Sequence, residues 1–163
     1  HTRCARWSRG LGDVYKRQHQ VSGFLGRYDF QMDEKGRVSL PAAFRKEAGG
    51  ERFILIQWEK PYLTLFPEDV WADVQKRLLE YRRADANSWN YVREITANAV
   101  EVSPDKQGRI LIPSWLQEAA SLKGTVVLSG VIDRVEVWDP EEFEKATQEK
   151  AEDSKRFRHQ IFG

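Results

Sequence analysis

An internal repeat is the feature that most restricts how this chain can fold. Residues 33–41 read DEKGRVSLP and residues 105–113 read DKQGRILIP, so Asp, Gly, Arg and Pro recur 72 positions apart. At the same offset, and without gaps, the apolar runs 53–56 and 63–66 also find counterparts in the second half. One register therefore fits both halves, which predicts two copies of the same supersecondary unit.

Each copy begins with strand periodicity on both sides of a short polar turn. In the first copy Tyr28, Phe30 and Met32 alternate with polar residues before the turn, and Val38 and Leu40 alternate after it. Alternation of period two is typical of a strand with one buried face. We therefore predict that the two arms pair with each other as a β-hairpin in each half.

The turn residues agree with this prediction. Asp33 and Asp105 suit the first position of a type I turn, because an Asp side chain bonds to the backbone that follows it. Gly36 and Gly108 can adopt the left-handed conformation of a bulged hairpin exit without steric cost. We assign turn geometry to these two glycines.

The remaining elements also repeat, which predicts an α+β fold. Pro41 and Pro113 each precede a short helix, and a second hairpin and a closing helix follow in each half. The expected bounds are 42–48 and 114–120 for the short helices, 53–58 with 62–66 and 125–131 with 134–138 for the second hairpins, and Pro67 and Asp139 for the starts of the closing helices. A further helix carrying Trp89, Val92 and Ile95 joins the halves.

An apolar stripe marks the closing helix of the first half. Trp71, Val74, Leu78 and Tyr81 recur at spacings of three, four and three residues, which is the spacing of one helix face. We expect these side chains to belong to the core. The tail beyond about residue 150 is charged, and we expect it to fray or to pack on a neighbouring subunit.

The opening segment differs from the rest in charge and pattern. Its first 18 residues hold five of the 26 Lys and Arg and one of the 25 Asp and Glu, which leaves 21 bases and 24 acids for the remainder. It lacks either periodicity and ends in GDVYKRQ, which looks like translated adapter sequence. We interpret residues 1–22 as a non-native or disordered leader; the alternative is a basic arm that binds nucleic acid or lipid.

Several classes of function lack support in the sequence. Cys4 is the single cysteine, and the three histidines have no metal-ligand spacing. No apolar run approaches the roughly 20 residues of a membrane span. A nucleophile–base pair and a glycine-rich phosphate loop are both missing. We therefore expect a cytoplasmic protein without catalytic residues, metal or cofactor, with neither a membrane nor a small-molecule substrate as its partner.

The two Asp-x-x-Gly-Arg tips are the candidate functional sites. Lys35 and Arg37 stand in one tip, and Lys106 and Arg109 stand in the other. A two-stranded ribbon fits a DNA major groove, and the arginine fork matches a guanine edge or a phosphate. The structural alternative is that each Asp and Arg simply form an ion pair that holds the loop. Both can hold at once, because an Asp that orients the fork lowers the entropy lost on binding.

The pattern as a whole resembles the MraZ family of bacterial transcriptional regulators, which carry two SpoVT-AbrB-type domains in tandem. The resemblance rests on Gly23-Phe24-Leu25-Gly26, on residues 33–45, on Val92-Arg93-Glu94-Ile95 and on residues 105–113. The doubled Asp-x-x-x-Arg motif followed by a strand and Pro is its most specific feature. Many members carry a basic residue where Leu25 stands, so an early phosphate contact is missing in this chain.

The resemblance implies a fold of two swapped-hairpin β-barrel halves with short helices and a C-terminal helix. It also implies domain bounds, which are 27–70 for the first SpoVT-AbrB domain, 71–98 for a helical connector, 99–142 for the second domain and 143–163 for the C-terminal helix and tail. The implied function is binding of double-stranded DNA at direct repeats in the protein's own promoter, within the division and cell-wall gene cluster. The implied state is a nucleoid-associated ring of identical subunits.

The resemblance also assigns roles to residues. Arg37 and Arg109 become the leading DNA contacts, Asp33 and Asp105 orient them, and Lys35 and Lys106 support them at phosphates. Gln107 occupies the position of Lys35 in the second tip, so the two tips are not equivalent readers.

Two other functions stay open at the level of the sequence. One is an antitoxin-like swapped-hairpin module that binds another protein through residues 145–163, although antitoxins of this fold generally lack a second copy. The other is a structural ring without a DNA function.

Overall fold

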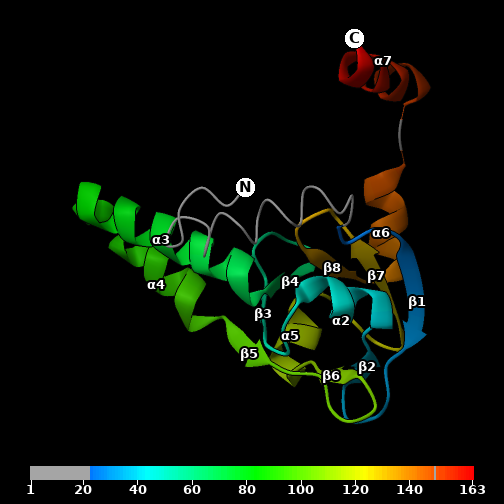
Figure 1. Ribbon diagram of the computed structural model, residues 1–163, viewed down its shortest axis with the longest axis horizontal. Coiled ribbons are helices and arrows are strands. Elements are labelled where there is room, and N and C mark those ends of the chain that lie inside the picture. Colours follow the sequence, from blue (N-terminus) through cyan, green and yellow to red (C-terminus); the bar gives the residue numbers. More distant parts are fainter. Residues whose placement is uncertain (1–22, 149) are drawn as a thin grey trace, which may run out of the picture.

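The computed structural model of the chain describes residues 23–148 and 150–163, so the predicted leader lies outside the described residues. An antiparallel six-stranded sheet in the order β1-β7-β8-β4-β3-β5 and a separate β2-β6 ribbon form its centre (Figure 1). The strands are β1 (Arg27–Gln31), β2 (Arg37–Ser39), β3 (Phe53–Ile56), β4 (Leu63–Pro67), β5 (Val100–Val102), β6 (Arg109–Leu111), β7 (Thr125–Gly130) and β8 (Val135–Trp138). The helices are α2 (Ala42–Ala48), α3 (Glu68–Ala84), α4 (Trp89–Ala97), α5 (Ser114–Ala119), α6 (Pro140–Thr147) and α7 (Ala151–Phe162), with a 3₁₀ turn η1 (Ala86–Ser88) between α3 and α4. The predicted α+β class is confirmed.

Most strand pairing runs between the two halves. β1 of the first half pairs with β7 of the second, β3 with β5, β4 with β8 and β2 with β6. Among the described strands, pairing within a half is limited to the hairpins β3-β4 and β7-β8. The halves are therefore interleaved, as the resemblance implied.

The prediction that the arms around each tip pair with one another is wrong. The first turn closes through the Asp33 N–H, which donates to the Arg37 carbonyl at 3.0 Å. Beyond that bond β1 and β2 diverge, and each forms its ladder with a strand of the second half. Alternating polarity shows that a segment is a strand, but it does not show which strand its backbone N–H and C=O groups pair with. Here the partners lie in the other half.

The register shows that the repeat is a local two-fold symmetry. Val38 of β2 lies opposite Ile110 of β6, and Thr64 of β4 lies opposite Glu136 of β8. Both pairs join positions 72 apart, so each residue faces its own counterpart. A two-fold axis therefore passes through both places.

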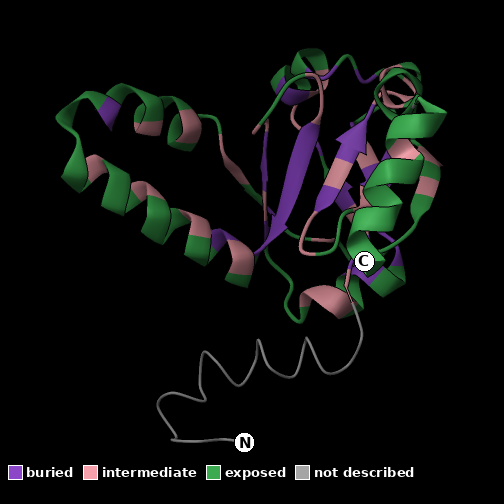
Figure 2. Ribbon diagram, turned by 90° about the horizontal axis from the view of Figure 1, so that it is seen from above, coloured by how far each residue is buried: buried purple, intermediate pink, exposed green. Residues whose placement is uncertain are grey.

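Buried residues gather on the central strands (Figure 2), and the core includes the inward face of the β2-β6 ribbon. Val38 and Ile110 are fully buried there. Phe44 of α2 packs edge-on against Phe24 and Tyr28, with ring centroids 5.6 and 5.2 Å away. Nineteen buried side chains from both halves share this main cluster, so the main core needs both halves. A smaller cluster contains Ile56, Phe66 and Trp71.

The short helices lie where the sequence predicted them, with small shifts in their bounds. α2 spans residues 42–48 as predicted, whereas α5 ends one residue early, at Ala119. At the start of α6 the Asp139 carboxylate accepts from the Glu142 N–H at 3.3 Å. The second hairpins are each shorter at the turn than predicted.

The apolar stripe of α3 is only partly a core face. Trp71 is buried and Val74 packs beside it, but Tyr81 is 70% exposed, so its predicted place in the core is wrong. The reason is that the α3-α4 hairpin projects beyond the sheet, where little covers its far end (Figures 1 and 2). Among the described residues, no helix combines the length and the apolar character that crossing a membrane requires.

The interleaved pairing leads to a prediction about the isolated halves. Residues 23–98 alone retain β1 and β2 but lose β7 and β6, their partners. We expect no folded monomer of this fragment, because its strands and its core faces are left open. Circular dichroism and sedimentation measure this: folding is expected only in a bimolecular species, with residues 99–163 or with a second copy. A well-dispersed NMR spectrum from a monomeric fragment would contradict the prediction.

Candidate nucleic-acid interface

The first tip is organised by one carboxylate. Asp33 Oδ1 accepts from the backbone N–H of Lys35 at 2.9 Å and from that of Arg37 at 2.8 Å. Its other oxygen, Oδ2, accepts from Arg37 Nε at 2.7 Å. One Asp therefore shapes the turn and orients the arginine side chain.

The second tip repeats this geometry. Asp105 Oδ1 accepts from the backbone N–H groups of Gln107 and Arg109, both at 2.9 Å, and Oδ2 accepts from Arg109 Nε at 3.0 Å. The repeat in sequence is thus a repeat in hydrogen bonding.

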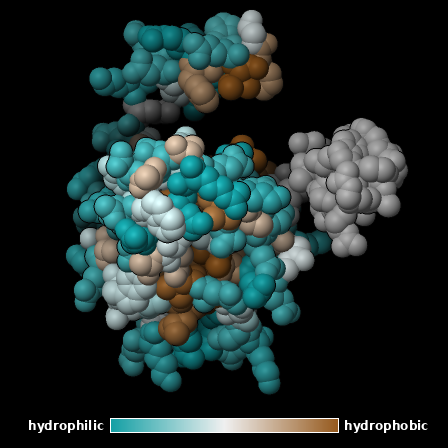
Figure 3. Space-filling model, turned by 90° about the vertical axis from the view of Figure 1, so that its left-hand side faces the viewer, coloured by the Kyte–Doolittle hydropathy of each residue, from teal (hydrophilic) through white to brown (hydrophobic). Residues whose placement is uncertain are grey.

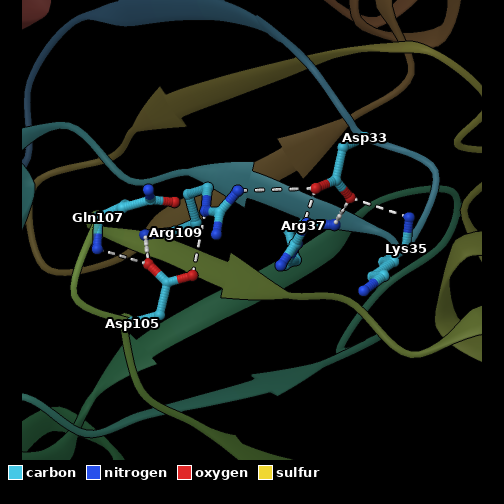
Figure 4. A network of polar contacts seen from close by, with 6 residues as sticks. All are labelled: Asp33, Lys35, Arg37, Asp105, Gln107 and Arg109. Atoms are coloured by element: carbon cyan, nitrogen blue, oxygen red, sulfur yellow. Dashed lines mark hydrogen bonds and ion pairs between the residues drawn. The ribbon is translucent and has the colours of Figure 1, made fainter.

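The β2-β6 ribbon brings the two tips side by side (Figure 4). Arg109 Nη1 lies 3.8 Å from Asp33 Oδ2, which links the tips. Along the ribbon Val38 and Ile110 face the core, so Arg37 and Arg109 lie on the opposite, outward face. The two arginines thus share one face of one ribbon.

Both arginines are held and yet reachable. Their side chains are 32% and 28% exposed, and the side-chain hydrogen bonds that they donate to Asp33 and Asp105 use only the Nε atoms. The ion pairs of the structural alternative are therefore present, but they leave the outer Nη edge of Arg37 unused by any described residue. Lys35 and Lys106 are exposed at the turns. The structure thus brings all six predicted charged residues together.

The electrostatics of the tips follow from the same bonds. The pKa of the Asp33 carboxyl is lowered below its usual 3.8, chiefly because the backbone N–H of Arg37 donates to the ionised form. The pKa of Asp105 is lowered in the same way, chiefly by the N–H of Arg109. Both carboxylates are therefore ionised at neutral pH and keep their arginines oriented.

The turn glycines adopt the conformation that was predicted for them. Gly36 has φ +86° and Gly108 has φ +77°, in the left-handed region. Each is also pressed against the other half: a β-carbon on Gly36 would overlap Gln117 Nε2, and one on Gly108 would lie 3.0 Å from Arg45 Cζ.

Arg45 is the residue near the tips that the sequence analysis did not single out. It lies on α2 of the first half and reaches the turn of the second. An exposed arginine on a short helix resembles any solvated surface residue, so the available signal was the 72-residue offset, which pairs Arg45 with Gln117. No group of three or more His, Cys, Asp or Glu within the described parts of the chain is placed to hold a metal.

The structure defines the class of fold, in which two tandem copies interleave and each carries an Asp-Arg tip. Comparison with known proteins then gives the family. The family model described as "MraZ protein, putative antitoxin-like" matches twice, at residues 24–90 and 95–160. The chain therefore belongs to the MraZ family. It is 37% identical over 130 residues to "Transcriptional regulator MraZ" of Leuconostoc mesenteroides, covering 80% of this chain and 90% of that protein. It is 42% identical over 120 residues to the protein of the same name from Carboxydothermus hydrogenoformans, covering 72% and 82%.

A glycine pair tests the crowding at the tip. Gly49 has φ +71° with open space around it, whereas Gly36 at +86° faces Ile112 O at 2.8 Å from a built β-carbon. We expect Gly49→Ala to cost about 1–2 kcal/mol of unfolding free energy for the backbone alone. Gly36→Ala is expected to cost roughly 1–3 kcal/mol more, for the clash. Urea unfolding measures both, and equal costs would show that the tip is not crowded.

We expect the hydrogen bonds that the Asp33 carboxylate accepts to be lost only below the usual pKa of an aspartate. Because the folded pKa of Asp33 is depressed, its stabilising bonds are complete above pH 3.8 and are lost as the pH falls through the lowered value. We expect the Arg37 amide resonance to titrate with a midpoint below 3.8. Asp33→Asn serves as the control, because it removes this transition. A midpoint at or above 3.8 would contradict the carboxylate contacts.

Proposed function

We propose that this chain is a sequence-specific DNA-binding regulator of transcription whose paired tips contact double-stranded DNA. The observation that carries the proposal is the shared outward face of Arg37 and Arg109, each oriented by an Asp through the Nε atom. An oriented fork loses little entropy on binding, and its Nη edge matches a phosphate or the O6/N7 edge of guanine. The relatives described above are named transcriptional regulators, which supports the same function.

The proposed target is a set of direct repeats in the protein's own promoter, within the division and cell-wall gene cluster. In this assignment Arg37 and Arg109 are the leading contacts, Lys35 and Lys106 support them at phosphates, and the protein works in the cytoplasm on the nucleoid. The resemblance to the family supplies this target. The ribbon supports it physically, because two strands present a width that a major groove admits.

The proposed active state is a ring of identical subunits. The chain beyond residue 18 holds 24 acids against 21 bases, so its net charge gives no general attraction to DNA. DNA affinity depends largely on neutralised phosphates, so weak tips need repetition. Several tips tethered in one assembly raise the effective concentration of each further contact.

The C-terminal helix supports self-association. α7 stands apart from the barrel in Figure 1, and hydrophobic side chains gather on one side of it in Figure 3. Phe157, Ile161 and Phe162 are 62%, 61% and 94% exposed. A second copy of the chain is the proposed occupant of this apolar face. A different protein partner, as in the antitoxin-like alternative, is the outcome that the second test below distinguishes.

Substitution of the tip arginines tests the DNA proposal. We expect Arg37→Ala to abolish selection of the repeats and Arg109→Ala to weaken binding by roughly 10-fold or more, since a lost fork is worth about 1–3 kcal/mol. Fluorescence anisotropy on the upstream region, with a scrambled duplex and two salt concentrations, measures this. Affinity is expected to fall steeply with salt, by about 0.9 in the logarithmic slope per neutralised phosphate. If both variants unfold, the arginines serve the fold rather than DNA.

Substitution in α7 tests the assembly. The double variant Phe157→Ser, Ile161→Ser is expected to form smaller assemblies in light scattering and to bind DNA more weakly, because the tips no longer act together. Glu152→Ser with Lys155→Ser on the same helix is the polar control. An unchanged subunit number would exclude this face from self-association and would favour another protein as its partner.

A further inference from the structure

The two tips differ in charge once the other half is taken into account. The first tip, residues 33–37, contains two acids and two bases, and the second tip, residues 105–109, contains one acid and two bases. The side chain from the opposite half that borders the first tip is the neutral Gln117, whereas the one that borders the second tip is the cationic Arg45. The formal charge therefore sums to zero for residues 33–37 with Gln117 and to +2 for residues 105–109 with Arg45.

Arg45 and Gln117 occupy equivalent places. Arg45 Nε donates to the Leu40 carbonyl at 3.1 Å, and Gln117 Nε2 donates to the Ile112 carbonyl at 2.7 Å. Both acceptors immediately precede the proline that starts the short helix. The structural task at this position is therefore a single hydrogen bond, and the chain itself shows that a glutamine performs it.

What Arg45 adds beyond that task is a charge at the turn. A β-carbon built on Gly108 would lie 3.0 Å from Arg45 Cζ and 3.1 Å from Nη2, so the guanidinium rests directly on the turn glycine. Gly108 directly precedes Arg109, the leading contact of the second tip. Arg45 is exposed, and its hydrogen bond uses only Nε. Its Nη edge therefore borders the surface on which DNA is proposed to lie.

We propose that Arg45 is a DNA phosphate-binding residue that the first half contributes to the second tip. This inference rests on the proposed function, because it places the DNA at the tips. It goes beyond that function by assigning a residue outside both Asp-x-x-Gly-Arg motifs and by locating the difference between the tips in the Arg45–Gln117 pair. A phosphate is the ligand, since a flanking cation grips the backbone at any sequence.

The test exploits the internal control that the repeat supplies. Arg45→Gln installs the side chain that already works at the equivalent position, so the hydrogen bond to the Leu40 carbonyl and the melting temperature are expected to be retained. We expect the affinity for DNA to fall about 3- to 10-fold on specific and scrambled duplexes alike. The logarithmic salt slope is expected to fall by about 0.9, the value for one phosphate.

Two further variants separate charge from structure. Arg45→Lys keeps the charge without the fork, so its salt slope is expected to stay near that of the wild type. Gln117→Arg places a matching cation at the first tip, and it is expected to raise the slope. If Arg45→Gln lowers the melting temperature, these two variants still decide the matter, because Gln117→Arg leaves Arg45 in place. Failure of Gln117→Arg to alter the slope would then count against a cation at this position.

Failure of this inference differs from failure of the proposed function. If Arg109→Ala weakens binding but Arg45→Gln leaves both affinity and slope unchanged, Arg45 is only a structural residue and the DNA function stands. If neither Arg37→Ala nor Arg109→Ala affects binding, the tips are not the DNA site and the role of Arg45 falls with them.

Discussion

Pairing of β2 with β6 is the constraint on which the rest of the structure depends. Val38 and Ile110 meet at its centre, and the ribbon continues beyond the strands, where the N–H of Leu40 donates to the Gly108 carbonyl at 2.8 Å and that of Ile112 to the Gly36 carbonyl at 2.9 Å. Each tip is thus bonded to the strand of the opposite half. The site can form only when both halves fold together, and the core that stabilises the fold also fixes the spacing between the two tips.

Much of this architecture could be predicted from the sequence because it is encoded locally. The Asp-Gly turns and the helix starts each follow from a few neighbouring residues, and the repeat follows from comparing these short motifs between the two halves. What could not be predicted depends on partners that are distant in sequence. Strand periodicity shows that β1 and β2 each have a buried face, but it does not identify the strand beside them. Helix periodicity placed Tyr81 on an apolar face without showing that the α3-α4 hairpin extends past the sheet that would cover it.

Asp33 and Asp105 lower the net positive charge of the tips but fix the conformation of the turn and of the arginine side chains. Asp33 and Asp105 cancel part of the positive charge of their own tips, which weakens long-range attraction to DNA. In return, each carboxylate holds two backbone N–H groups and one guanidinium, so the tip has little conformational freedom left to lose on binding. Such a tip would attract DNA less strongly over long range, but its fixed geometry would favour a ligand of matching shape. Repetition of tips in the proposed assembly would compensate, because it raises affinity without adding charge to any one tip.

The difference between the two tips has a consequence for how the subunit would lie on the proposed DNA site. Two identical tips related by a two-fold axis would match a DNA site with the same symmetry, and they would bind it equally well in either direction. The proposed direct repeats have a direction, so a subunit that bound them in one orientation would need a difference between its two tips. The backbone is two-fold symmetric locally, where Val38 faces Ile110 and Thr64 faces Glu136. At the tips the difference lies in the side chains: Gln107 stands where the first tip has Lys35, and Gln117 stands where the first half has Arg45. Under the proposal for Arg45, this difference would orient the subunit on DNA.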